Sequence, residues 1–117
     1  MAPKKNPLKL NPLQLKTLAL VQELAGLPDN GRKDATSGNI ALQWLPNPHG
    51  DHFHVGSAVV MGRDATGLHN QSVWVALSRK GLTAIGERGE VAITPAGMAY
   101  DTGVRDQILM RSDHEGH

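Results

Sequence analysis

The amino-acid sequence predicts one small domain of the α+β class, and three local patterns carry that prediction. An apolar helix pattern follows Asn11-Pro12, a second helix pattern ends at Arg79-Lys80-Gly81, and two short β runs enclose residues 86–89. Helix and strand signals that alternate along the chain, with turn residues between them, are typical of a mixed fold. A length of 117 residues is close to the commonest domain size, so we expect one domain over residues 11–111.

The first helix is expected to begin at Asn11, because Asn is a good N-cap and Pro12 loses nothing at the first helical position. Apolar residues recur through 13–25 as a wide band on about four turns. Gly26 ends the pattern. The stretch 28–38 is rich in Pro, Gly, Asn, Asp and Ser, and it is predicted to be a loop.

A β-hairpin is predicted before the second helix. Residues 40–45 and 52–56 are strand-like runs, and residues 46–51 between them are rich in Pro, Gly, Asn and Asp. Residues 57–63 suit either a continuation of the second strand or the start of a short helix, and the sequence leaves both open.

The second helix is expected at residues 70–80. Arg79 and Lys80 lie at its negative dipole end, and Gly81 provides the stop.

After this helix, residues 82–85 and 91–93 are predicted to form a second hairpin around a glycine-rich turn. Thr94-Pro95 repeats the cap-plus-proline start and predicts a helix over residues 96–100. Residues 104–110 are expected to add another turn or two of helix.

Both chain ends are predicted to be flexible. Residues 1–10 carry three lysines and two prolines and form the expected basic arm, and residues 112–117 form a disordered tail. Through residue 33 there are six basic residues against two acids, whereas the remainder is mildly acidic. Such an arm could lie along phosphates, or it could simply act as a solubilising tail.

Composition removes several classes of protein. The chain has no cysteine, which excludes disulfide scaffolds, thiolate zinc sites and cysteine nucleophiles. It has no apolar run approaching the roughly 18 residues of a spanning helix and no secretory signal, so we expect a cytoplasmic protein with no membrane partner. Its net charge is only +1, far from the strong basic excess of many nucleic-acid binders.

The segment from Gly67 to Gly97 resembles the bacterial winged helix-turn-helix superfamily, of which the multiple-antibiotic-resistance regulators are one branch. In that superfamily a recognition helix ends in a basic-basic-Gly-Leu run, here Arg79-Lys80-Gly81-Leu82, and leads into a β-hairpin wing. The returning strand closes with a Leu-Thr-Pro-Ala-Gly-like sequence, here Ile93-Thr94-Pro95-Ala96-Gly97. The resemblance implies a winged helix with an additional β-hairpin before the recognition helix.

This resemblance also implies a transcriptional regulator that binds double-stranded DNA, with its recognition helix in the major groove. A homodimer follows as a hypothesis, because such modules read paired half-sites and because Val104, Ile108 and Leu109 are apolar. Winged helices also serve as protein-interaction modules without nucleic-acid affinity, and this alternative stays open. The residues expected to contact DNA are His69, Asn70, Gln71 and Ser72 at base edges, with Arg79 and, at the wing tip, Arg88.

A histidine cluster provides the third hypothesis, a metal sensor. His52 and His54 are two apart on a predicted strand, so they project from one face. This spacing can give two imidazole ligands to zinc or nickel, with His49 or Asp51 as a third. The alternative is an exposed β face that carries two histidines, or a pH-sensitive surface.

The sequence does not favour an enzyme. It lacks the Gly-x-Ser-x-Gly elbow, the phosphate-binding Gly-x-x-x-x-Gly-Lys loop and a glycine-rich dinucleotide turn. Asp51 beside His52 and His54 offers only a generic acid-base group.

Overall fold

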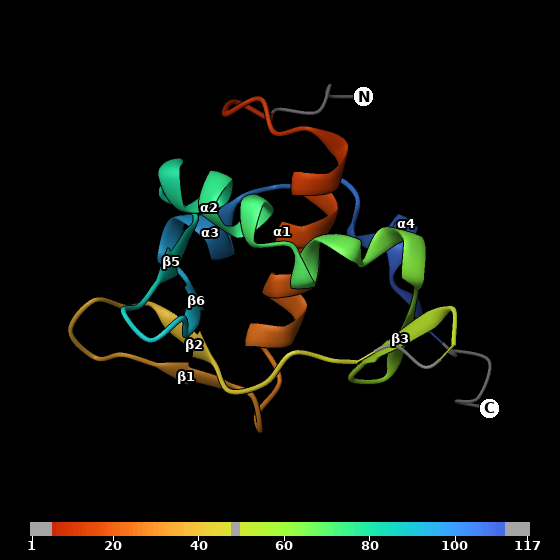
Figure 1. The fold of residues 1–117 in the computed structure, drawn as a ribbon, viewed down its shortest axis with the longest axis horizontal. Coiled ribbons are helices and arrows are strands. Elements are labelled where there is room, and N and C mark those ends of the chain that lie inside the picture. Colours follow the sequence, from red (N-terminus) through yellow and green to blue (C-terminus); the bar gives the residue numbers. More distant parts are fainter. Residues whose placement is uncertain (1–5, 48–49, 112–117) are drawn as a thin grey trace.

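Helix α1 (Pro12–Ala25) lies at the centre of the protein, with the other elements packed around it (Figure 1). The computed structural model describes residues 6–47 and 50–111 and shows an α+β fold. Asn11 accepts a hydrogen bond from the backbone N–H of Gln14 at 2.8 Å, and the Gln14 side chain accepts one from the Asn11 N–H at 3.0 Å. This reciprocal capping box, followed by Pro12, confirms the predicted start of the helix.

Burial of α1 extends over its whole circumference. Residues 17–22 are six consecutive buried positions. Six residues cover more than one full turn at 3.6 residues each, so neighbours must approach the helix from every side. Leu18, Leu20, Val21 and Leu24 are each 0% exposed. The helix is therefore the core of the domain and not an amphipathic cover on its surface.

One antiparallel sheet lies on one side of α1. It contains β1 (Gly31–Lys33), β2 (Ile40–Leu42), β5 (Thr83–Ile85) and β6 (Val91–Ile93) in the order β1-β2-β6-β5. The fully buried Ile93 of β6 aligns with Ile40 of β2 on one side and with Thr83 of β5 on the other. The β5–β6 hairpin, predicted from residues 82–93, is thus extended into a sheet by β2.

A second antiparallel sheet lies across α1 from the first (Figure 1). It contains β3 (His52–Val55), β4 (Ala58–Met61) and β7 (Met110–Arg111) in the order β3-β4-β7. Phe53 and Val55 are buried on one face of β3, and the alternating His54 is exposed, as the sequence pattern predicts.

The predicted hairpin between residues 40–45 and 52–56 is wrong. β2 pairs with β1 and β6, whereas β3 pairs with β4 through a turn in which Gly56 has a φ of +60°. The segment 28–38 is also not all loop, because it contains β1. The pairing error has a physical cause: turn residues mark where a strand ends, but they do not specify the strand with which it pairs.

Two 3-10 helices, η1 (Gly62–Asp64) and η2 (Thr66–His69), lead into α2 (Gln71–Arg79). The backbone of η2 approaches α1 closely at Gly67, where an added Cβ atom would lie 1.9 Å from Oγ1 of Thr17. Trp74 of α2 donates from Nε1 to the backbone oxygen of Leu68 at 2.9 Å. These contacts fix η2 and α2 as one layer against α1.

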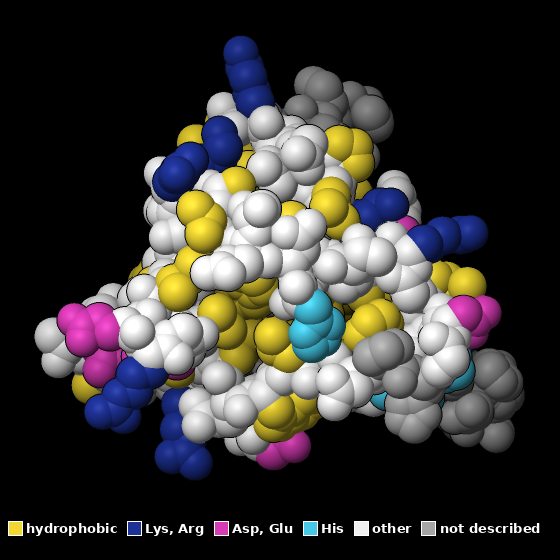
Figure 2. All heavy atoms as spheres, in the orientation of Figure 1, with side chains coloured by type: hydrophobic (Ala, Val, Ile, Leu, Met, Phe, Trp, Pro, Cys, Tyr) yellow, Lys and Arg dark blue, Asp and Glu magenta, His cyan; other side chains and the backbone are white. Residues whose placement is uncertain are grey.

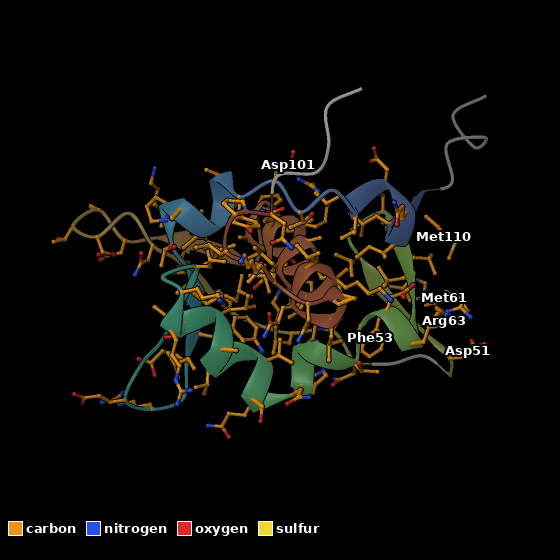
Figure 3. The ribbon with its side chains drawn as sticks, turned by 90° about the horizontal axis from the view of Figure 1, so that it is seen from above. Asp51, Phe53, Met61, Arg63, Asp101 and Met110 are labelled. Carbon is orange, nitrogen blue, oxygen red and sulfur yellow. The ribbon has the colours of Figure 1, made fainter. Side chains whose placement is uncertain are left out.

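The opposite face of α1 is covered by α3 (Pro95–Ala99), α4 (Arg105–Ile108) and the segment between them (Figure 3). Val104, Ile108 and Leu109 are buried here at 8%, 4% and 7% exposure. The apolar surface for a homodimer that these three residues were expected to supply is therefore absent, because they pack into the core of their own chain.

Part of the segment predicted as a flexible arm is packed on the domain. The hydroxyl of Tyr100 donates to Oδ1 of Asn6 at 2.6 Å and accepts from the N–H of Leu8 at 3.1 Å. Leu10 is buried at 4% exposure. Residues 1–5 and the tail 112–117 lie outside the described residues, as does His49. None of the described helices combines the length and the apolar character that a membrane crossing requires.

Gly97→Ala should destabilise the protein. A Cβ atom at this position would lie 2.1 Å from the backbone oxygen of Leu82. The clash outweighs the better helix propensity of Ala, so we expect a net loss of about 1–2 kcal/mol in the free energy of unfolding, measured by urea denaturation. Gly26→Ala is the matched control, because its Cβ atom would approach nothing closer than 3.6 Å. Equal stability of the two variants would contradict the packing of α3.

In the turn between β1 and β2, the protonation of Asp34 makes the stability of the fold depend on pH. The carboxylate of Asp34 accepts hydrogen bonds from the N–H of Ser37 at 2.7 Å and from its hydroxyl at 2.8 Å, and these bonds lower the pKa of Asp34. A lowered folded-state pKa stabilises the fold above the unfolded pKa, and this contribution is lost as the pH falls through the folded one. Ser37→Ala should raise the pKa of Asp34 in an NMR titration; an unchanged value would contradict the turn geometry.

Candidate nucleic-acid interface

The residues predicted to contact DNA lie on the surface around α2. His69, Asn70, Gln71 and Ser72 are consecutive, exposed positions at the N-terminal end of the helix. Arg79 is exposed at the other end, about 10 Å further along the helix axis. Arg88 is exposed in the turn between β5 and β6. All six residues are exposed, although the ring of His69 also contacts Phe53 and Pro46.

The two sides of α2 differ in chemistry. Val73, Trp74 and Leu77 are buried against the domain, whereas the outward flank carries Gln71, Ser72 and Arg79. No residue of the helix is acidic. A polymer of phosphates therefore meets no repulsive carboxylate on α2 itself.

Asn70 holds the start of this helix. Its Oδ1 accepts a hydrogen bond from the N–H of Ser72 at 3.0 Å, in the manner of an N-cap. The side-chain nitrogen of Asn70 donates to no residue in the part of the chain that the structure describes, so its two N–H donors face solvent.

His69 connects the start of α2 with the segment around Pro46. Its Nε2 lies 2.9 Å from the backbone oxygen of Pro46, and since a carbonyl only accepts, Nε2 carries the proton. The His69 ring also stacks on Phe53, with centroids 6.3 Å apart. Sequence reasoning missed this structural role, because Pro46 and Phe53 are far from His69 along the chain.

Basic side chains gather at the C-terminal end of α2 (Figure 2). Lys80 donates from Nζ to the backbone oxygen of Leu8 at 2.9 Å, which places the exposed Lys9 of the packed N-terminal segment in the same neighbourhood. The turn between β5 and β6 is less favourable to phosphate, because Glu87 and Glu90 flank Arg88 there. The stronger positive charge thus lies beside the end of the helix.

A groove of about 310 Å³ separates α2 from the β5–β6 hairpin. Figure 2 shows it as a hollow lined by hydrophobic side chains beside a histidine. Ile85 at its edge is 36% exposed. No sequence pattern pointed to this groove, since its lining comes from three separate stretches of chain: Leu45, then Leu68, His69, Gln71 and Trp74, then Ile85, Gly89 and Val91.

The two histidines of β3 lie side by side, as predicted. The ring centroids of His52 and His54 are 4.9 Å apart in an edge-to-face arrangement. Oδ1 of Asp51 lies 3.5 Å from Nδ1 of His52. Among residues 6–47 and 50–111, no group of three or more histidine or acidic side chains is arranged to hold a metal ion. The proposed third ligand, His49, lies outside these ranges.

Comparison with known proteins does not assign the chain to a family. No family model matches the chain, and searches of curated proteins and of solved structures find no match.

Asn70→Ala should cost about 1 kcal/mol in the free energy of unfolding, because Ala cannot accept the bond from Ser72. Asn70→Asp should keep the stability, since a carboxylate caps equally well and is favoured at the positive end of the helix. Urea denaturation of both variants measures this difference. If Asn70→Ala is as stable as the parent, the cap is not formed in solution.

Proposed function

We propose that the protein is a regulator that binds double-stranded DNA in the cytoplasm through α2 and the β5–β6 hairpin. One observation carries the proposal: α2 exposes an acid-free polar flank beside the hairpin while its apolar side is buried. A helix held in this way can enter the major groove, which is about 12 Å wide. The resemblance of residues 67–97 to winged helix-turn-helix regulators supports the same assignment.

In this proposal, residues at the N-terminal end of α2 recognise the bases. The amide groups of Asn70 and Gln71 offer both donors and acceptors, and such groups can pair with adenine in the major groove. The hydroxyl of Ser72 can donate to or accept from several bases. Because Oδ1 of Asn70 is engaged in the helix cap, its side chain contributes donors, and Gln71 is the better candidate for a two-bond contact.

In this proposal, residues at the C-terminal end of α2 bind the phosphates. Arg79 and Lys80 lie at its C-terminus, and Lys9 lies nearby. Arg88 adds a single positive charge at the hairpin, where Glu87 and Glu90 oppose it. This charge pattern supports binding of modest strength, with most counterion release at the end of α2.

The apolar groove favours a second candidate, a protein-interaction module without nucleic-acid affinity. Ile85 and Val91 line the groove, Ile85 is 36% exposed, and the nearby acids Glu87 and Glu90 suit a partner with an apolar side chain flanked by basic residues. The two candidate surfaces share His69 and Gln71, but only the first candidate binds nucleic acid, so a nucleic-acid titration separates them.

Titration of a labelled generic duplex should give an association constant that falls as salt rises. Arg79→Gln should weaken binding to all sequences and reduce the slope of log K against log salt by about 1. Arg63→Gln is the matched control, because Arg63 is exposed on the β3–β4 side, away from α2 (Figure 3). Absence of binding even near 50 mM salt would overturn the DNA proposal and favour the protein-interaction module.

Asn70→Asp provides a second test that is independent of stability. The substitution keeps the helix cap but adds a negative charge at the proposed base-contact end, so duplex affinity should fall at least several-fold. Fluorescence anisotropy with the same duplex measures the change. Unaltered affinity in a stably folded Asn70→Asp protein would show that this end of α2 does not face DNA.

A further inference from the structure

A pocket of about 470 Å³ lies between α1, α3 and α4. It follows the segment between α3 and α4, on the side of α1 away from α2 (Figure 3). Its volume is in the range that accommodates small ligands. The side chains that form it come from α1, α3, α4 and the segment between the last two: Gln22, Met98, Tyr100, Asp101, Thr102 and Asp106, among others.

Gln22 is the most informative residue of the pocket, because it is a polar side chain only 5% exposed. Its Nε2 donates to the backbone oxygens of Gly97 at 2.8 Å and Tyr100 at 2.7 Å, which uses both N–H groups and fixes the orientation of the amide. Its Oε1 accepts no hydrogen bond from any residue in the described ranges 6–47 and 50–111.

This free oxygen is not sealed in the core. In the described part of the chain, Nδ2 of Asn30 is the one fully enclosed side-chain polar atom without a partner. Oε1 of Gln22 therefore keeps contact with the pocket that Gln22 lines. An acceptor held rigidly at the wall of a pocket can take a hydrogen bond from water or from the donor of a ligand that displaces the water.

The charged side chains that line the pocket indicate which kind of ligand it would bind. Asp101 and Asp106 line it. Among the described residues, the one hydrogen bond to these two carboxylates is donated by the N–H of Gly103 to Oδ1 of Asp101, at 3.1 Å. The guanidinium of Arg105, also at the pocket, is paired with Glu23 of α1. Because Glu23 offsets the charge of Arg105, the carboxylates of Asp101 and Asp106 give the described lining a net negative character beside the carbonyl oxygen of Gln22.

We propose that this pocket binds a small organic cation with a primary ammonium group. The three N–H donors of an ammonium match the oxygen of Gln22 and the carboxylates of Asp101 and Asp106. Met98 and Tyr100 provide an apolar surface for the hydrocarbon part of the ligand, which favours an organic amine over a hydrated metal ion. Anions are repelled. The proposal does not depend on DNA binding.

Titration of the isotope-labelled protein with diaminobutane tests the proposal by NMR, with butanediol as the neutral probe of the same length. The side-chain amide signals of Gln22 should shift in a saturable manner with the diamine and not with the diol. The double variant Asp101→Asn with Asp106→Asn should weaken binding at least about tenfold, because each lost charge weakens a charge-assisted hydrogen bond. Asp29→Asn, an exposed acid that does not line the pocket, should bind as the parent does.

Three results would overturn the proposal. The first is the absence of a saturable shift at Gln22. The second is an equal response to the diol, which would remove the role of charge. The third is unchanged diamine affinity in the double variant. Asparagine retains the acceptor for the N–H of Gly103, and thermal unfolding of the double variant checks that it is folded.

Discussion

The structure depends on the burial of one helix on all its sides. Residues 17–22 of α1 are buried without interruption, so no face of the helix is left to solvent in its middle turns. Sheets close it on two sides, η2 and α2 on a third, and α3 with α4 on the fourth (Figure 1). Because so small a chain has little material for each layer, every layer is thin, and strands of two to four residues are enough to complete it.

This arrangement separates two surfaces of different chemistry. Gly67 of η2 packs on Thr17 at one side of α1, while Gln22, less than two turns further along, bonds to Gly97 and Tyr100 on the other. The polar flank of α2 and the acidic pocket therefore rest on the same rigid element without touching each other. The ion pair between Arg105 and Glu23 also links α4 to α1.

Several residues of the proposed interface also hold the fold. Asn70 caps α2, and His69 holds the segment around Pro46. Their presence is thus explained without DNA. The side chains of Gln71, Ser72 and Arg79 make no such structural bond in the described part of the chain, so they are the stronger indication of an external ligand.

The α-helices and the β5–β6 hairpin follow from local sequence, because caps, glycines and apolar periodicity act within a few residues. Asn11-Pro12, Asn70 and Thr94-Pro95 all begin helices as predicted. Other features became visible in the folded chain alone: β2 pairs with β6, Val104 and Ile108 are internal, and Gln22 lines a pocket beside Asp101. These features join residues 50 to 80 positions apart, and no local pattern specifies such a partner, since pairing and burial are set by the packing of the whole chain around α1.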